Sequence, residues 1–194
     1  MPFFVRFWGT RGSCPTPGNR TRKYGGNTPC VGLTIDETLL VCDGGTGLRE
    51  LGLDLVERKG AAPSCHLFFS HTHWDHIQGF PFFIPAYLPS STLHVYDGRG
   101  EQTQVQELLS GQMKSEYFPV DFVNLRAQVL IGRLGADPLD IDGITVCCQP
   151  LNHPGGAMGY SFEKGGCKVV YASDNELDLH LQNLEEAAQH PARL

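Results

Sequence analysis

No stretch of the sequence is apolar for the roughly eighteen residues that a membrane-spanning helix needs. The apolar start, Met1 to Trp8, is too short and wrongly flanked for a secretory signal and is predicted to hold the first strand. The seven cysteines contain no CxxC pair and are odd in number, so a disulfide framework is excluded. These absences predict a cytoplasmic protein with free thiols, in which Cys147 and Cys148 are small buried side chains of a strand.

The size and composition are those of one ordinary folded unit. The chain has 194 residues, of which 41% are hydrophobic and 19% charged, and it shows neither an internal repeat nor a linker. This is enough chain for one substantial core, so we predict a single domain over residues 1–194.

Charge is distributed unevenly. The formal net charge of −6 argues against a protein that coats nucleic acid. Five basic residues nevertheless gather near the N-terminus: Arg6, Arg11, Arg20, Arg22 and Lys23. The last three lie in a segment rich in Gly, Pro, Asn and Thr, which is either a solvated loop or a loop that binds phosphate oxygens.

Hydrophobic patterning predicts short strands that alternate with a few helices. The predicted strands are Phe3 to Trp8, Cys30 to Ile35, Thr38 to Cys42, His66 to Ser70, Thr92 to Tyr96, Ile144 to Gln149, Gly159 to Glu163 and Lys168 to Ala172. The predicted helices are Gly47 to Lys59, Gln102 to Ser110 and Glu176 to Gln189. This order predicts an α/β sandwich in which sheets pack together and helices cover the outside.

The most informative segment is the run His71-Thr72-His73-Trp74-Asp75-His76, which follows an apolar stretch. It places three histidines and one aspartate in six positions. Neutral imidazole and carboxylate groups are ligands of zinc, iron and manganese, so the run predicts a metal site. A single histidine hydrogen-bonded at a strand end would be ordinary, but four such side chains together are not.

Two later segments also place a ligand-type residue where a predicted strand ends. His153 lies in Asn152-His153-Pro154-Gly155-Gly156, and Asp174 lies in Ala172-Ser173-Asp174-Asn175-Glu176. Each has an ordinary explanation when taken alone, since Asp174 is also suited to cap a helix. Their order after the histidine run makes both of them candidate ligands.

This order of motifs resembles the metallo-β-lactamase superfamily over nearly the whole chain: Asp43 in Val41-Cys42-Asp43-Gly44-Gly45, then HxHxDH, then His153, then Asp174. The resemblance implies an αββα sandwich that lacks its last C-terminal elements. It is strongest to the phosphodiesterase-type branch related to tRNA 3′-end-processing ribonucleases and cyclic-phosphate phosphodiesterases.

The resemblance also implies a set of ligands. One metal ion would be held by His71, His73 and His153, a second by Asp75 and His76, and Asp174 would bridge the two. The ions are expected to be zinc, with manganese or iron as alternatives, and a hydroxide between them would attack the substrate. Asp75 would also act in catalysis by orienting that nucleophile, whereas Asp43 would order the loop beneath the histidines.

The expected substrate is a small phosphodiester, because no Lys/Arg-rich insertion resembling the tRNA-binding arm occurs between His76 and His153. The aromatic segment Gly79 to Leu88 either walls an apolar substrate pocket or belongs to the core. The turn Gly44-Gly45-Thr46-Gly47 lacks the lysine of a nucleotide-binding P-loop.

The sequence departs from the family pattern after Asp174. Family members usually have a further histidine there, and the only histidines left are His180 and His190, in or beside the predicted helix. An alternative function is therefore a metal-binding or sensory module with weak or no turnover. A redox protein using iron and a flavin partner is a third hypothesis, and a dimer in which a partner copy covers an exposed sheet is another consequence to consider.

Overall fold

The computed structural model describes residues 3–59, 63–98 and 102–176. These residues form a six-stranded sheet with the order β1-β2-β3-β4-β5-β6 and a four-stranded sheet with the order β10-β9-β8-β7. The strands of the first sheet are β1 Phe3–Gly9, β2 Cys30–Ile35, β3 Thr38–Cys42, β4 Ser64–Phe69, β5 Thr92–Asp97 and β6 Gln128–Arg133. Those of the second sheet are β7 Leu139–Ile141, β8 Ile144–Leu151, β9 Ala157–Lys164 and β10 Cys167–Tyr171.

The helices are few and mostly short. The α-helices are α1 Gly47–Lys59, α2 Trp74–Ile77 and α3 Gln102–Gly111. The 3-10 helices are η1 Asn19–Thr21, η2 Phe80–Phe82, η3 Ile84–Tyr87 and η4 Phe122–Asn124. None of these described helices combines the length and the apolar character that crossing a membrane requires.

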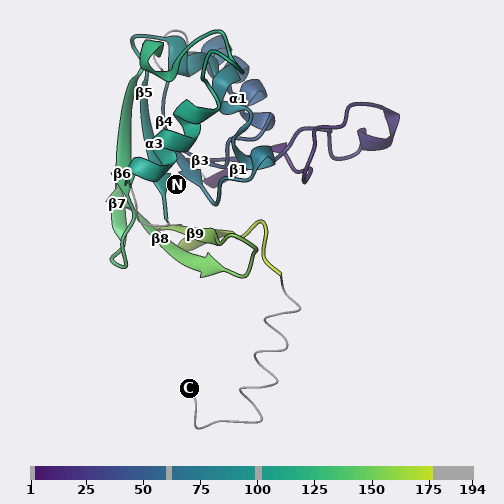
Figure 1. The fold of residues 1–194 in the computed structure, drawn as a ribbon. Helices are drawn as coiled ribbons and strands as arrows, with labels where there is room; N and C mark the ends of the chain where they lie inside the picture. The colour runs from purple at the N-terminus through teal and green to yellow at the C-terminus, as the bar shows by residue number, and fades with distance from the viewer. Residues whose placement is uncertain (1–2, 60–62, 99–101, 177–194) are drawn as a thin grey trace.

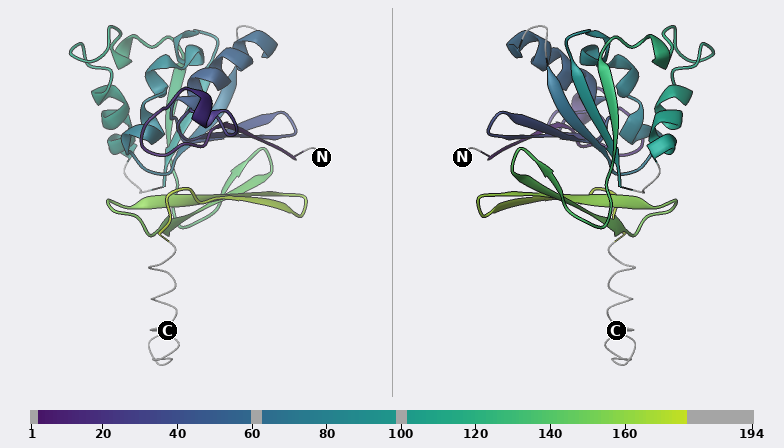
Figure 2. Two further views of the ribbon diagram at one scale, coloured as in Figure 1. Left: turned by 90° about the vertical axis from the view of Figure 1, so that its right-hand side faces the viewer. Right: turned by 90° about the vertical axis from the view of Figure 1, so that its left-hand side faces the viewer.

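Figure 2 shows the layers: helices lie on one face of the six-stranded sheet, and the four-stranded sheet lies on the other. Among the described residues, helices cover only that one outer face. The helix predicted at Glu176 to Gln189 lies outside the described residues, apart from Glu176, which is not helical. The described chain thus contains an α layer and two β layers of the predicted sandwich.

Alternating side chains on β4 build both cores. Cys65, Leu67 and Phe69 are buried under the helices, whereas Phe68 is buried between the sheets against the rings of Tyr96 and Phe162. This is the two-residue period of a strand that is covered on both faces. Strands β3, β4, β5 and β6 run parallel, so their carboxyl ends meet at one edge of the sheet.

Two interpretations of apolar residues are settled by burial. Phe80 and Phe83 of the aromatic segment are fully buried in the core under the helices, while Phe82 is 52% exposed and packs edge-on against Phe118. The segment is therefore mainly core. The prediction that Cys147 and Cys148 are buried is wrong, since both are partly exposed and free. Adjacent residues of β8 face opposite sides of the sheet, so Cys148 packs against the core between the sheets, while Cys147 faces the other side, which no described helix covers.

Candidate metal centre

The histidine run lies in the connection between β4 and α2, at the carboxyl edge of the parallel strands. Ser70 and His71 continue directly from β4 and are buried, and His73 is the N-cap residue of α2 with an extended backbone. Asp75 and His76 are the second and third residues of α2 and are buried as well. An extended segment followed at once by a helical turn thus directs four ligand-type side chains toward one region.

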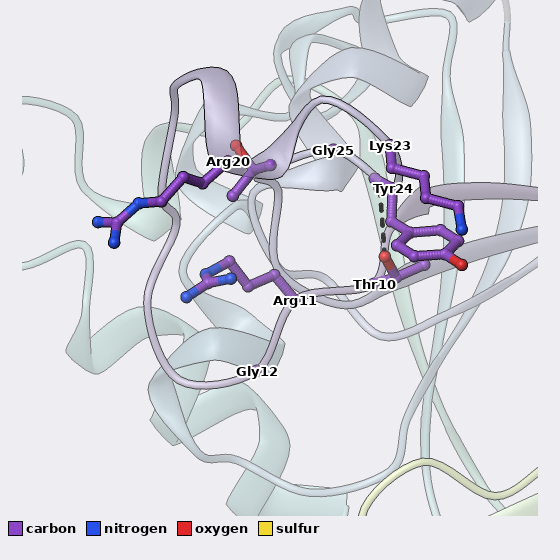
Figure 3. Close-up of a pocket in the computed structure, with 8 residues that line it drawn as sticks. Thr10, Arg11, Gly12, Arg20, Lys23, Tyr24 and Gly25 are labelled. Atoms are coloured by element: carbon purple, nitrogen blue, oxygen red, sulfur yellow. Dashed lines mark hydrogen bonds between the residues drawn. The ribbon is translucent and has the colours of Figure 1, made fainter.

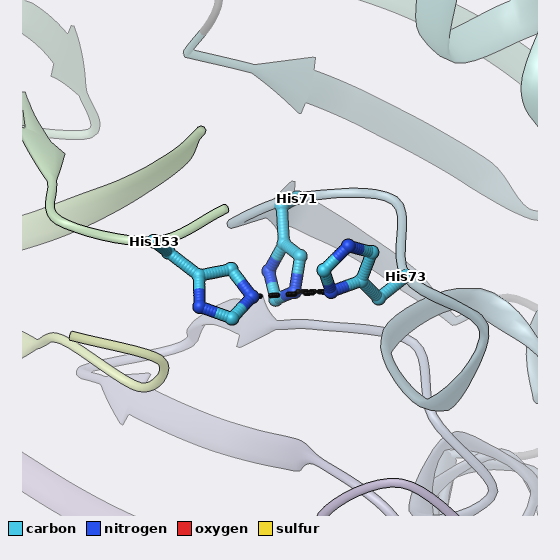
Figure 4. Close-up of side chains that lie close together, drawn as sticks. All are labelled: His71, His73 and His153. Carbon is cyan, nitrogen blue, oxygen red and sulfur yellow. Dashed lines mark hydrogen bonds between the residues drawn. The ribbon is translucent and has the colours of Figure 1, made fainter. Parts of the chain in front are cut away.

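The first group of side chains consists of His71, His73 and His153. Nδ1 of His73 lies 3.0 Å from Nε2 of His71 and 3.1 Å from Nε2 of His153 (Figure 4). Donor atoms bound about 2.0–2.1 Å from a tetrahedral ion lie about 3.3 Å from one another, so this spacing is close to that of a zinc site. His153 follows β8 of the second sheet, and the group therefore joins the two sheets.

The second group consists of His76, Asp75 and Asp174. Nε2 of His76 is buried and has no hydrogen-bond partner among the described residues, while Oδ2 of Asp75 and Oδ1 of Asp174 each lie 3.5 Å from it. A buried polar atom without a partner is costly unless something else binds it. An unpartnered imidazole nitrogen that faces two carboxylates fits a cation.

Asp174 lies between the two groups. Its Oδ2 atom is 3.8 Å from Nε2 of His71 and 3.7 Å from Nε2 of His153, and its Oδ1 atom faces His76. His71, His76 and Asp174 place one ligand atom each within 4.8 Å of one another, as do His71, His73 and His153. The six candidate ligands predicted from the sequence are thus brought together, and the carboxylate of Asp174 faces histidines of both groups.

Asp43 holds the residues around the site in position through hydrogen bonds. Its carboxylate accepts hydrogen bonds from the Ser70 amide at 2.7 Å, the Ser70 hydroxyl at 2.8 Å and the Tyr171 hydroxyl at 2.6 Å. It also lies 2.7 Å from Nδ1 of His76. These contacts orient the His76 ring so that Nε2 faces the site, which is how an outer carboxylate positions a metal-binding histidine.

The turn after β3 packs directly on α2. The Gly44 amide donates to the carbonyl of His76 at 2.7 Å, and the Gly79 amide donates to the carbonyl of Gly44 at 2.8 Å. A Cβ atom on Gly79 would lie 1.9 Å from the Gly45 carbonyl oxygen, so this close approach requires glycine. The glycine-rich turn therefore positions α2.

The electrostatic environment differs between two neighbouring histidines. Burial, followed by the proximity of His76, lowers the pKa of His71 to about 4, so its ring is neutral and able to bind a metal ion at pH 7. Burial also lowers the pKa of His76, but the hydrogen bond and charge of Asp43, with the charges of Asp174 and Asp75, outweigh it and raise this pKa overall. Without a metal ion, these carboxylates thus favour the protonated form of His76 more than that of His71.

Three contributors were missed by the sequence analysis. The Ser13 amide donates to Oδ2 of Asp75 at 2.7 Å, the Tyr171 hydroxyl donates to Asp43, and Oε1 of Glu176 lies 3.9 Å from Nδ1 of His153. Tyr171 and Glu176 flank the predicted ligand Asp174, which could have drawn attention to them. Ser13 contributes a backbone group, which residue type does not reveal. His180 and His190, considered as replacements for a further ligand, lie outside the described residues.

No protein-family model matches the sequence. The chain is 25% identical over 166 residues to ribonuclease Z of Staphylococcus carnosus (strain TM300), a match that covers 82% of this chain and 49% of that protein. The chain thus spans about half the length of this curated relative.

Several solved structures share the fold. The metallo-β-lactamase fold protein YhfI of Bacillus subtilis superposes with a TM-score of 0.61 at 20% identity, covering 87% of this chain and 60% of that one. A diphosphatase from the PhnP family gives 0.59 at 20% identity, covering 83% and 62%. The short form of human tRNase Z gives 0.59 at 19% identity, covering 86% and 67%. The predicted fold is confirmed by these similarities.

Proposed function

We propose that this chain, a member of the metallo-β-lactamase superfamily, acts as a single-domain, metal-dependent hydrolase of small phosphodiesters. One observation carries the proposal. Three imidazole nitrogens of His71, His73 and His153 converge at the spacing of a metal site, and beside them a buried, unpartnered nitrogen of His76 faces two carboxylates. The similarity to ribonuclease Z supports the phosphodiester as the substrate class.

The donor set fits two divalent ions. His71, His73 and His153 would hold one, Asp75 and His76 the other, and Asp174 would contact both. Nitrogen and carboxylate donors favour zinc and also suit manganese or iron. When bound, such a pair lowers the pKa of water and stabilises the attacking and leaving oxygens of a phosphodiester.

The residues of the chain have separate tasks around that chemistry. Asp75 is the proposed catalytic carboxylate, and the Ser13 amide holds its Oδ2 atom on the side that faces His76. A carboxylate so fixed can orient a water molecule and accept its proton. Asp43 keeps the His76 ring in position, and the burial that keeps His71 neutral leaves its nitrogen lone pair available to a metal ion.

The test begins with elemental analysis of the purified protein and assays on bis(p-nitrophenyl) phosphate and on cyclic nucleotides. We expect close to two divalent ions for each chain and hydrolysis that a chelator abolishes. The double variant His73→Ala, Asp75→Ala should lose at least about a hundredfold in kcat/KM. His94→Gln, which replaces a histidine of β5 that stacks on His66 outside the site, is the matched control and should retain activity.

Two results would contradict the proposal. Unchanged hydrolysis by the double variant would show that the activity arises elsewhere or from a contaminant. Bound metal with no hydrolysis of any ester would instead favour the alternative function, a metal-binding or sensory module.

A further inference from the structure

The N-terminal part of the chain is basic and lacks acidic residues. The first acidic residue of the sequence is Asp36. Of the five cations before it, Arg6 pairs with Asp54 at 3.2 Å, whereas no acidic side chain of the described residues pairs with Arg11, Arg20, Arg22 or Lys23. In a chain of net charge −6, a group of cations in one loop that described acidic side chains do not neutralise creates a local positive field that attracts anionic groups.

This loop, residues 10–26, is held by its own hydrogen bonds. The Thr16 amide donates to the Gly26 carbonyl at 2.9 Å, the Thr21 hydroxyl donates to the Thr16 carbonyl at 2.8 Å, and the Gly25 amide donates to the Thr21 carbonyl at 2.8 Å. These bonds join the two arms of the loop across its width. The loop backbone that carries the cations is thus already ordered before a ligand binds, which lowers the entropy cost of binding.

The loop borders an open surface pocket of about 590 Å³ that Arg11, Arg20 and Lys23 line. Figure 3 shows the Arg11 and Arg20 guanidinium groups directed to the same side, with Lys23 on the opposite side over the ring of Tyr24. Among the described residues, the hydrogen bond of the Arg11 side chain runs from Nε to the Cys14 carbonyl at 3.2 Å. No described residue forms a hydrogen bond or ion pair with the terminal nitrogens of either arginine, so the described structure leaves these nitrogens available to a ligand.

The loop that carries this pocket also contacts the candidate metal centre, through Ser13. Its amide donates to Asp75 at 2.7 Å, and its φ of 67° is a left-handed conformation that costs a serine about 1 kcal/mol or more. Arg11 is two residues away, so its Cα atom lies within about 7 Å of that of Ser13. Arg11 is therefore carried by the same loop segment that contacts the candidate ligand Asp75.

We propose that Arg11 and Arg20 bind a second phosphate group of the substrate, next to the phosphodiester that is hydrolysed. Two guanidinium groups with free N–H donors match phosphate oxygens, and Arg binds phosphate through paired hydrogen bonds. The inference rests on the proposed function and names its substrate class: a short oligonucleotide fragment with a phosphorylated end. The phosphate adjacent to the scissile one then occupies the pocket.

The experiment compares a thymidine dinucleotide with the same dinucleotide carrying a 5′-phosphate or a 3′-phosphate. We expect one phosphorylated form to be hydrolysed with a kcat/KM about tenfold higher, the effect of one or two charge-assisted hydrogen bonds. Arg20→Gln should bring this ratio close to one. Arg22→Gln removes the same charge from the same loop but does not line the pocket, and it should leave the ratio unchanged.

Equilibrium binding of the same three dinucleotides, measured by calorimetry, separates failure of this inference from failure of the proposed function. If none of them is hydrolysed but the phosphorylated form still binds about tenfold more tightly in an Arg20-dependent manner, the pocket is supported and the hydrolase proposal fails. Hydrolysis or binding that ignores the terminal phosphate, or equal losses in Arg20→Gln and Arg22→Gln, would overturn the inference.

Discussion

At the scale of single residues, Asp43 contacts several of the side chains that form or surround the candidate site. It is almost completely buried, has a left-handed φ of 62°, and its carboxylate is contacted by Ser70, His76 and Tyr171. A buried carboxylate is stable only when hydrogen bonds and a nearby positive charge replace its hydration. The residue therefore couples the stability of the fold to the orientation of His76.

Replacing Asp43 by asparagine should affect both properties. An amide keeps the shape but turns one acceptor into a donor, which would then face the donors of Ser70 or Tyr171. We expect Asp43→Asn to lower the free energy of unfolding by about 2–4 kcal/mol and metal affinity by about 10–100-fold. Denaturant unfolding and competitive metal titration measure these two quantities.

Asp36→Asn is the matched control for this substitution. Asp36 also has a left-handed φ, of 54°, but its side chain is partly exposed and forms a surface ion pair with Lys164 at 3.0 Å. Surface pairs contribute about 0–1 kcal/mol, so the control should lose little stability and no metal affinity. Equal losses at both positions would contradict the role given to Asp43.

Residue types alone predict the candidate ligands better than they predict the groups that hold those ligands in position. The four ligand-type side chains of the histidine run are adjacent in sequence, and their chemistry is visible there. Ser13 acts through its amide, a group that every residue except proline has, so its contact with Asp75 depends entirely on the path of a loop. Contacts of this kind become visible only once the fold is known.

At the scale of elements, all eight predicted strands have a counterpart, and α1 has the predicted bounds. Strands β6 and β7 were not predicted. In β6 the glycine at 132 looks like a strand breaker, yet a Cβ atom there would lie 2.3 Å from the Tyr96 ring, so the glycine makes room for a neighbouring strand. Helix α2 has four residues, too few for a helical period to appear in the sequence.

The pairing of β4 with β5 also sets the ionisation of a histidine outside the metal centre. His66 lies opposite His94, with ring centroids 4.5 Å apart, and its Nδ1 atom is 3.2 Å from the Tyr96 hydroxyl. Burial, followed by the proximity of His94, lowers the pKa of His66 to about 4. In the unfolded chain a histidine has a pKa of about 6.5.

This shift predicts a dependence of stability on pH. Between about pH 6.5 and pH 4 the unfolded state binds a proton at His66 that the folded state does not, so protonation favours unfolding and stability falls as the pH is lowered. Because the ring is partly exposed, we expect a contribution of about 1–2 kcal/mol. Unfolding of His66→Phe should lose less stability over this range than that of the unsubstituted chain.

An NMR titration of the His66 ring provides a direct check, with a midpoint expected near pH 4. A midpoint near the ordinary value of about 6.5, or parallel pH profiles of the variant and the unsubstituted chain, would rule out this contribution.

At the scale of the whole molecule, the candidate site lies where the two sheets meet. The segment after β4 supplies His71 and His73 from the first sheet, and the segments after β8 and β10 supply His153 and Asp174 from the second. The protein joins the same sheets elsewhere by the Tyr160 hydroxyl, which donates to the Phe69 carbonyl at 2.5 Å. A metal ion held by residues of both sheets would add a cross-link at their shared edge.

Metal binding should therefore raise the melting temperature, and the effect should depend on ligands from the second sheet. At a free zinc concentration of about 100 times Kd the stabilisation is about 2.7 kcal/mol, which corresponds to roughly 5–10 °C for a chain of this size. Calorimetric scans with zinc and with a chelator measure the difference in melting temperature.

His153→Ala and Asp174→Asn should each remove most of this difference, because each substitution breaks the connection between the sheets. Glu163→Gln changes an exposed carboxylate of β9 in the same sheet and should keep the full shift. A full shift in His153→Ala would mean that the first sheet alone holds the metal and that the second contributes no ligand.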